Sequence, residues 1–306
     1  MTEVFDPDAL MQIRDISWRA QTLLAATSSG VHRSLHHGAS IEFSQYRDYT
    51  PGDDPRLIDW KLFGRTDRYG VKQFEDETAR RVYLIVDQSR SMGYKTVSHS
   101  KLRYSQTLAA TLALDLHRRR DRVGVLTFDE SIETFVPPSR NSHQLARVFK
   151  VLSNEERGEA TDIGGALQEV AELVPSRALV ILFSDGLIPL DELAEPLALI
   201  AGREHEVLWI RAMDPREVHL DAPEGSQLRD RESGQLRFID AASIEKYHRQ
   251  FDAHALGLRN LCDDLGITLV SVRTDKPLVD QMIEIFEAAS LRRSADLLSI
   301  DREAIK

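Results

Sequence analysis

An acid and two hydroxyls alternate directly after a short apolar run in the first half of the chain. Asp87, Ser89 and Ser91 follow the run from Val82 to Val86. A uniformly apolar, β-rich run is typical of a strand covered on both faces, so its polar end would lie at the carboxyl edge of a sheet. Ligands of doubly wound sheets bind at this edge. One carboxylate and two neutral hydroxyls suit a hard divalent cation, with Mg²⁺ as first choice and Mn²⁺ or Ca²⁺ as alternatives.

Two later segments would complete this cation site. Thr161 lies in an expected loop that opens a helix, and Asp185 ends a second apolar run at residues 178–183. A purely structural alternative is that Asp87 and Ser91 only cap the next helix. Capping does not explain why Thr161 and Asp185 also fall where strands or helices are expected to begin or end. Three segments in this order are more specific than one short polar motif. The predicted metal residues are Asp87, Ser89, Ser91, Thr161 and Asp185.

Composition sets limits on the class of protein. The 306 residues include 39 Lys and Arg against 49 Asp and Glu, a net charge of −10 that disfavours general nucleic-acid binding. The single cysteine, Cys262, excludes an internal disulfide framework and fits a reducing compartment. The first residues lack a basic, apolar leader, and no stretch approaches the ~20 apolar residues of a membrane span. We therefore expect a cytoplasmic protein without a transmembrane segment.

Strands and helices alternate regularly after residue 80. The expected strands cover residues 82–87, 122–128, 177–184, 205–211 and 267–273, with 132–136 as a short antiparallel edge. This alternation predicts an α/β fold with a doubly wound, mostly parallel sheet. Between residues 214 and 240, the pairs Glu224-Gly225 and Ser233-Gly234 indicate an inserted β-hairpin.

Three parts of the chain are expected from this pattern. Residues 1–79 would hold an amphipathic helix at 8–27 and a charged, aromatic segment with short strands. Residues 80–292 would form the α/β domain with its insertion at about 214–240. Residues 293–306 would be a tail or a short helix.

Several motifs together resemble a known family. They are Gly30-x-His32-Arg33-Ser34, Tyr46-Arg47-Asp48-Tyr49-x-Pro51-Gly52-Asp53-Asp54 and Arg56-x-Ile58-Asp59-Trp60, followed by Arg65 and the Asp87 triplet. This combination resembles a bacterial and archaeal family catalogued as a domain of unknown function, number fifty-eight, whose members look like von Willebrand factor A-type proteins.

The resemblance carries expectations for the fold, the site and the partner. It implies a von Willebrand factor A-like domain with a metal-ion-dependent adhesion site, in which Ser89, Ser91 and Thr161 bind the metal directly and the two acids bind partly through water. It also implies a partner, because members of the family are commonly encoded beside AAA+ ATPases of the MoxR type. A protein client would then offer a carboxylate to the metal.

The segment between residues 47 and 65 interleaves charges of both signs with aromatic residues. It could be a docking surface for a partner, or an intramolecular network that pins the amino-terminal part of the chain. The residues of the candidate docking surface are Arg47, Asp53, Asp54, Arg56, Asp59, Trp60 and Arg65.

Catalytic motifs give little support to an enzyme. The chain has no G-x-x-x-x-G-K-[ST] phosphate loop and no G-x-S-x-G elbow. The strongest enzymatic alternative is Mg²⁺-dependent phosphoryl transfer through Asp87, but Ser89 stands where haloacid-dehalogenase-like phosphatases place their second acid. We expect a non-enzymatic, metal-dependent protein-binding module, an adaptor or substrate-recruiting partner of a MoxR-type AAA+ ATPase in complex assembly or maturation. A self-assembling scaffold is the further alternative.

Overall fold

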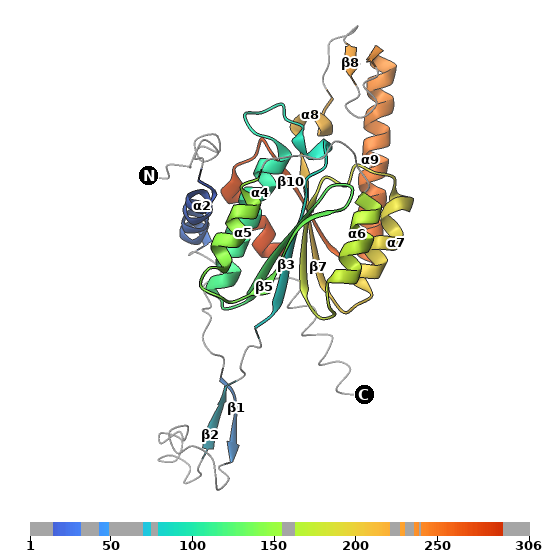
Figure 1. Ribbon diagram of the computed structural model, residues 1–306. Coiled ribbons are helices and arrows are strands. Elements are labelled where there is room, and N and C mark those ends of the chain that lie inside the picture. The colour runs from blue at the N-terminus through green and yellow to red at the C-terminus, as the bar shows by residue number, and fades with distance from the viewer. Residues whose placement is uncertain are drawn as a thin grey trace. The chain divides into compact units, whose positions relative to one another are not determined.

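The computed structural model describes residues 15–31, 43–48, 70–74, 79–154, 163–220, 227–229, 236–238 and 240–289. The chain divides into two compact units, one formed by His32–Ala79 and the other by Met1–Val31 with Arg80–Lys306 (Figure 1). The domain division expected above places the first helix with the segment up to residue 79. In the structure this helix, α2 (Ile16–Val31), belongs to the larger unit, because its buried side chains join the core there.

A six-stranded sheet forms the centre of the larger unit, in the order β10-β7-β6-β3-β4-β5. Its strands are β3 (Arg81–Asp87), β4 (Arg122–Phe128), β5 (Ile132–Ser139), β6 (Leu179–Ser184), β7 (Glu206–Met213) and β10 (Thr268–Arg273). All neighbours pair in parallel except β4 and β5, which are antiparallel. The expected α/β fold with a doubly wound, mostly parallel sheet is thus confirmed.

Both faces of this sheet are covered, as the continuous apolar runs predict. Successive residues of β3 alternate between two cores: Leu84 belongs to one cluster and Ile85 to the other. The first core contains α2, α4 (Lys101–Arg118) and α5 (Gln144–Leu152), and the second contains α6 (Ile163–Leu173), α7 (Leu190–Ala201) and α9 (Ala241–Asp264). Figure 1 shows these helices on opposite sides of the sheet.

The edge strand β5 carries two prolines, Pro137 and Pro138, at its end. Proline lacks the backbone donor that a central strand needs, so it is tolerated at an edge. The neighbouring strand makes room for it, because an added Cβ at Gly124 would lie 2.6 Å from the Val136 carbonyl oxygen and 2.7 Å from the Pro138 nitrogen. Only glycine lets the two backbones approach this closely.

Shorter elements complete the described part of the chain. A 3₁₀ turn, η2 (Ser91–Gly93), follows β3, and α8 (Pro215–Val218) follows β7. The predicted inserted hairpin is present as β8 (Gln227–Arg229) paired antiparallel with β9 (Leu236–Phe238). In the smaller unit, β1 (Phe43–Asp48) pairs antiparallel with β2 (Gly70–Phe74). None of the helices among the described residues combines the length and apolar content that crossing a membrane requires.

Candidate metal site

The two predicted metal-site acids lie at the carboxyl edge of adjacent strands. Asp87 is the last residue of β3, and Asp185 directly follows β6. Because β3 and β6 pair in parallel with Val86 opposite Phe183, both acids leave the sheet at the same edge. Each side chain is fully buried. The hydroxyl of Ser184 donates a 2.6 Å hydrogen bond to Oδ2 of Asp87 and so joins the two strand ends.

The hydroxyls of Ser89 and Ser91 converge next to these acids, with their Oγ atoms 3.1 Å apart. The turn after β3 brings them together, because the backbone N–H of Ser89 donates to Oδ1 of Asp87 over 2.8 Å. The Ser91 hydroxyl also helps to hold the pKa of Asp185 below its ordinary value. Ser89 is buried, whereas Ser91 is partly exposed. The hydroxyl pair therefore links both acids and opens to solvent at Ser91.

The position of Asp185 is held by the turn that follows it. Its Oδ1 accepts a 3.1 Å bond from the N–H of Leu187, and its backbone carbonyl accepts a 2.9 Å bond from Nε of Arg211. Between them Gly186 adopts a left-handed φ of 60° and packs against the ring of Trp209. A side chain at this glycine would be strained, so the turn depends on its absence.

The two acids have opposite pKa shifts although both are buried. Burial, and then the neighbouring Asp185 carboxylate, raise the pKa of Asp87 to about 6. Burial acts on Asp185 in the same direction, but the Lys101 ammonium outweighs it and holds the pKa of this carboxyl below its ordinary value. Asp185 is therefore ionised at neutral pH, and Asp87 carries a charge that its surroundings disfavour.

The donor set fits a hard divalent cation. Two hydroxyls and two carboxylates at one sheet edge offer the oxygen ligands that Mg²⁺ prefers, and the unfavourable charge on Asp87 is what a cation would relieve. In the described part of the chain no group of three or more His, Cys, Asp or Glu residues is placed to hold a metal. A site here therefore has to use the serine hydroxyls, as the sequence predicts.

The structure brings together four of the five predicted metal residues. Thr161 lies outside the described residues, and so do six members of the candidate docking surface: Asp53, Asp54, Arg56, Asp59, Trp60 and Arg65. The seventh member, Arg47, belongs to β1 in the smaller unit. The role of that surface stays a prediction.

Sequence reasoning missed two charged residues beside the acids. Nζ of Lys101 lies 2.7 Å from Oδ2 of Asp185 and 2.5 Å from Oε1 of Glu217, and the lysine side chain has no exposed area. A signal for Glu217 existed, because Asp214-Pro215-Arg216-Glu217 has the pattern of a capping box with proline in the first turn, and the structure contains that box. Nothing local distinguishes Lys101 from a solvated lysine at a helix start.

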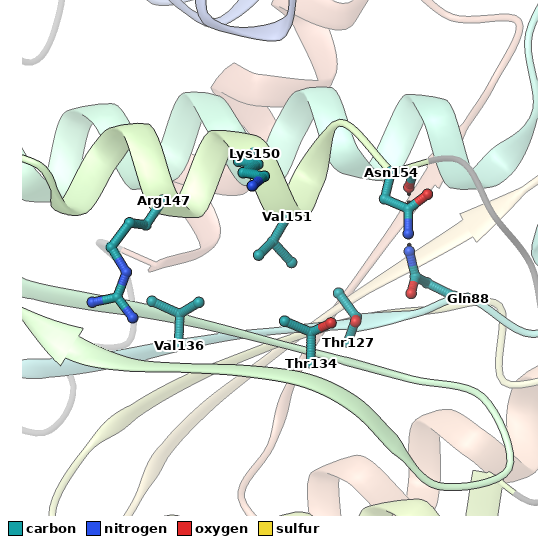
Figure 2. A pocket seen from close by; sticks show the side chains of 8 residues that line it. All are labelled: Gln88, Thr127, Thr134, Val136, Arg147, Lys150, Val151 and Asn154. Carbon is teal, nitrogen blue, oxygen red and sulfur yellow. Dashed lines mark hydrogen bonds between the residues drawn. The ribbon is translucent and has the colours of Figure 1, made fainter.

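A groove of about 620 Å³ lies next to this site, between α5 and strands β4 and β5. Figure 2 shows Gln88, the residue after Asp87, at one end of the groove and Arg147 at the other. The Gln88 amide donates a 3.3 Å bond to the Asn154 carbonyl, and Lys150 adds a second positive charge along α5. The groove thus extends from the metal-site turn along a basic helix.

Comparisons with known proteins agree with the resemblance noted in the sequence. An uncharacterized protein of Mycobacterium bovis is 28% identical over 298 residues, which make up 96% of this chain and 93% of that protein. An uncharacterized protein of Mycobacterium tuberculosis gives the same values.

Two solved structures are similar to about two thirds of this chain. The conserved hypothetical protein BatB from Bacteroides thetaiotaomicron has a TM-score of 0.40 and 17% identity, covering 67% of this chain and 98% of that one. The SpRpn10 VWA domain has a TM-score of 0.39 and 10% identity, covering 65% and 92%. The sequence model of a family described as "Protein of unknown function DUF58" matches residues 45–259. This match covers more than half of the chain, which therefore belongs to that family.

Proposed function

We propose that this chain is a non-enzymatic, metal-dependent protein-binding module that acts as an adaptor or substrate-recruiting partner of a MoxR-type AAA+ ATPase in complex assembly or maturation. The observation that carries the proposal is the pair of converging hydroxyls, 3.1 Å apart, beside two buried carboxylates. The partial exposure of Ser91 leaves this site open to a macromolecular partner.

The chain's own residues would hold the cation, with Mg²⁺ as the first choice and Mn²⁺ or Ca²⁺ as alternatives. Ser89 and Ser91, with Thr161 by resemblance, would bind it directly, and Asp87 and Asp185 would supply charge partly through water. When bound, the cation would offer an open coordination position to a carboxylate of the partner protein. Neutral hydroxyl ligands support this role, because they leave more of the cation's charge available to the incoming group.

The surroundings of Asp87 favour binding over phosphoryl transfer. A nucleophilic carboxylate needs an oxygen that can reach the phosphorus atom. Both oxygens of Asp87 already accept hydrogen bonds, from Ser89 and Ser184, and the side chain has no exposed area. These hydrogen bonds hold the Asp87 carboxylate against the turn that carries Ser89. This arrangement suits a residue that positions the ligands of a binding site.

The groove next to the site supports an acidic partner surface. Arg147 and Lys150 are exposed on α5, and the groove that they line begins at Gln88, directly after Asp87. A partner that presents one carboxylate to the site would place neighbouring acids along this helix. We propose the charged segment at residues 47–65 as a second contact with the partner. We also propose that the protein acts in the cytoplasm.

A pull-down against the MoxR-type ATPase of the same genome tests the proposal. Wild type should bind in Mg²⁺, lose binding in EDTA and regain it when Mg²⁺ is restored. Asp87→Ala should bind at least tenfold less. Glu204→Ala is the matched control, because Glu204 is an exposed acid at the amino end of β7, at the opposite edge of the sheet.

The alternatives give different results in the same preparations. Capture that survives both EDTA and Asp87→Ala would place the interface away from the metal site. A chain that binds no ATPase but forms a defined homo-oligomer would be a scaffold. Turnover of a generic phosphate ester that depends on Mg²⁺ and is lost in Asp87→Asn would make the chain an enzyme.

A further inference from the structure

Lys101 is a buried cation that contacts the candidate metal site without belonging to its predicted ligands. Its ammonium donates to Oδ2 of Asp185 over 2.7 Å and to Oε1 of Glu217 over 2.5 Å, and it lies 6.0 Å from the ring centre of Tyr94. No part of the side chain is exposed. A lysine is almost never fully buried unless carboxylates pair with it, so these two acids account for its position.

The location of Lys101 in its helix also calls for such partners. It is the first residue of α4, directly after the cap Ser100, and the first turn contains no acid. A positive charge at this end opposes the helix dipole. The favourable interaction with Asp185 and Glu217 must therefore exceed both the dipole penalty and the cost of removing the ammonium from water.

Glu217 is held in place independently of the lysine. Its Oε2 accepts a 2.9 Å bond from the N–H of Asp214, as part of the capping box of α8. Its backbone carbonyl accepts a 2.8 Å bond from the hydroxyl of Tyr247 in α9. Lys101 consequently has two fixed anchors, and only one of them, Asp185, belongs to the metal site.

We propose that Lys101 is a built-in competitor of the divalent cation: its ammonium occupies the Asp185 carboxylate and thereby limits the affinity of the site for metal. This inference rests on the proposed function, since the cation is the one proposed there. Asp185 has its charge matched by Lys101, whereas the structure shows no cationic partner for Asp87 among the described residues. A divalent ion would be attracted mainly by Asp87 and repelled by the ammonium.

The competition has a consequence for partner binding. A site that held its cation through two free carboxylates would neutralise most of the ion's charge. With Asp185 bound to Lys101, less carboxylate charge reaches the cation, and an incoming carboxylate gains more from binding it. Lys101 therefore lowers the affinity of the free chain for metal and makes metal binding depend more strongly on the partner's carboxylate.

Binding of Mn²⁺ to the full-length chain, followed by the electron paramagnetic resonance signal of the free ion, tests this inference. Lys101→Met removes the charge and keeps an unbranched chain of similar length. It should bind Mn²⁺ at least tenfold tighter than wild type, because the repulsion between the ammonium and the divalent ion is lost. Lys101→Arg keeps the charge and should stay within about threefold of wild type.

Glu217→Gln provides a test of opposite sign. It removes the second anchor and leaves the ammonium to Asp185 alone, so Mn²⁺ binding should weaken. A merely structural role for the lysine would weaken binding in both variants. Lys101→Met could be unfolded in EDTA. In that case, recovery of its circular dichroism signal on adding Mn²⁺ would support the inference. No recovery, together with unchanged Mn²⁺ affinity in Glu217→Gln, would overturn it.

The outcomes separate this inference from the proposed function. Equal Mn²⁺ affinity in wild type and Lys101→Met would overturn the competition and leave metal-dependent binding intact. Binding by Lys101→Met alone would support the competition and remove the metal from the function of the wild-type chain. Binding by neither protein would overturn both.

Discussion

Replacing Asp87 by asparagine should make the metal-free protein more stable at neutral pH and leave its stability almost unchanged near pH 4. The asparagine would not carry the charge that burial and Asp185 disfavour at this position. The amide keeps a similar shape, and its oxygen can still accept the hydrogen bond that Asp87 now accepts from Ser89. The predicted gain therefore comes from removing a buried charge, not from a new contact.

The size of the gain follows from the pKa of Asp87. This pKa is about 6 in the folded protein. With about 3.9 in the unfolded chain, the difference corresponds to about 3 kcal/mol. Because the folded pKa is the higher one, the folded state binds more protons between about pH 4 and 6, and its stability falls as the pH rises through this window. Above about pH 6.5 the full penalty is present, and below about pH 4 it has vanished.

Chemical denaturation in EDTA, at several pH values between 4 and 7.5, measures the effect. The useful quantity is the difference in unfolding free energy between Asp87→Asn and wild type, because other titrating groups cancel in it. This difference should grow by about 3 kcal/mol in favour of the variant from pH 4 to 7.5. Saturating Mg²⁺ should reduce or reverse this difference, because only wild type keeps the Asp87 carboxylate as a metal ligand and is stabilised fully by the ion. A difference that stays flat with pH would refute the electrostatic account of this site.

Two glycine substitutions test the backbone that positions the site. Gly124→Ala should lower the unfolding free energy by about 2 kcal/mol or more, because the new Cβ would lie 2.6 Å from the carbonyl oxygen of Val136; an unchanged denaturation midpoint would contradict the close approach of β5. Gly186→Ala should weaken Mn²⁺ binding at least threefold, because a side chain at φ 60° and 2.7 Å from the Trp209 ring has to displace the turn that holds Asp185. Unaltered Mn²⁺ affinity in a folded Gly186→Ala protein would show that this turn does not position a ligand.

The sheet could be predicted from the sequence because its inner strands are buried on both faces. Such strands are continuous apolar runs, and the four inner strands, β3, β4, β6 and β7, begin and end within two residues of their expected limits. The edge strand was predicted to end at Val136 but continues to Ser139 through two prolines. Proline usually ends a strand, and it is accommodated here because the edge needs no outward donor and Gly124 opposes it.

The candidate site could be predicted only as far as strand ends determine it. Asp87 and Asp185 meet because β3 and β6 are parallel neighbours, and the carboxyl ends of parallel strands lie at the same edge of the sheet. The parallel sheet expected from the sequence already places both strand ends at this edge. The partners of Lys101 do not follow from any local pattern. Asp185 is 84 positions away along the chain and Glu217 is 116. Only the tertiary fold shows that a lysine at a helix start is buried between two acids.

The three charged groups at the site connect metal affinity to stability. Without metal, Asp87 carries an unfavourable charge at neutral pH, while Asp185 is satisfied by Lys101. A cation would relieve Asp87 and disturb the lysine pair, so the net stabilisation by metal is the difference between these two effects. Removing Lys101 should therefore lower the stability of the metal-free protein and enlarge the stabilisation that metal confers. That opposite movement distinguishes a competing cation from a lysine that only fills space, whose loss would destabilise the free and the metal-bound protein equally.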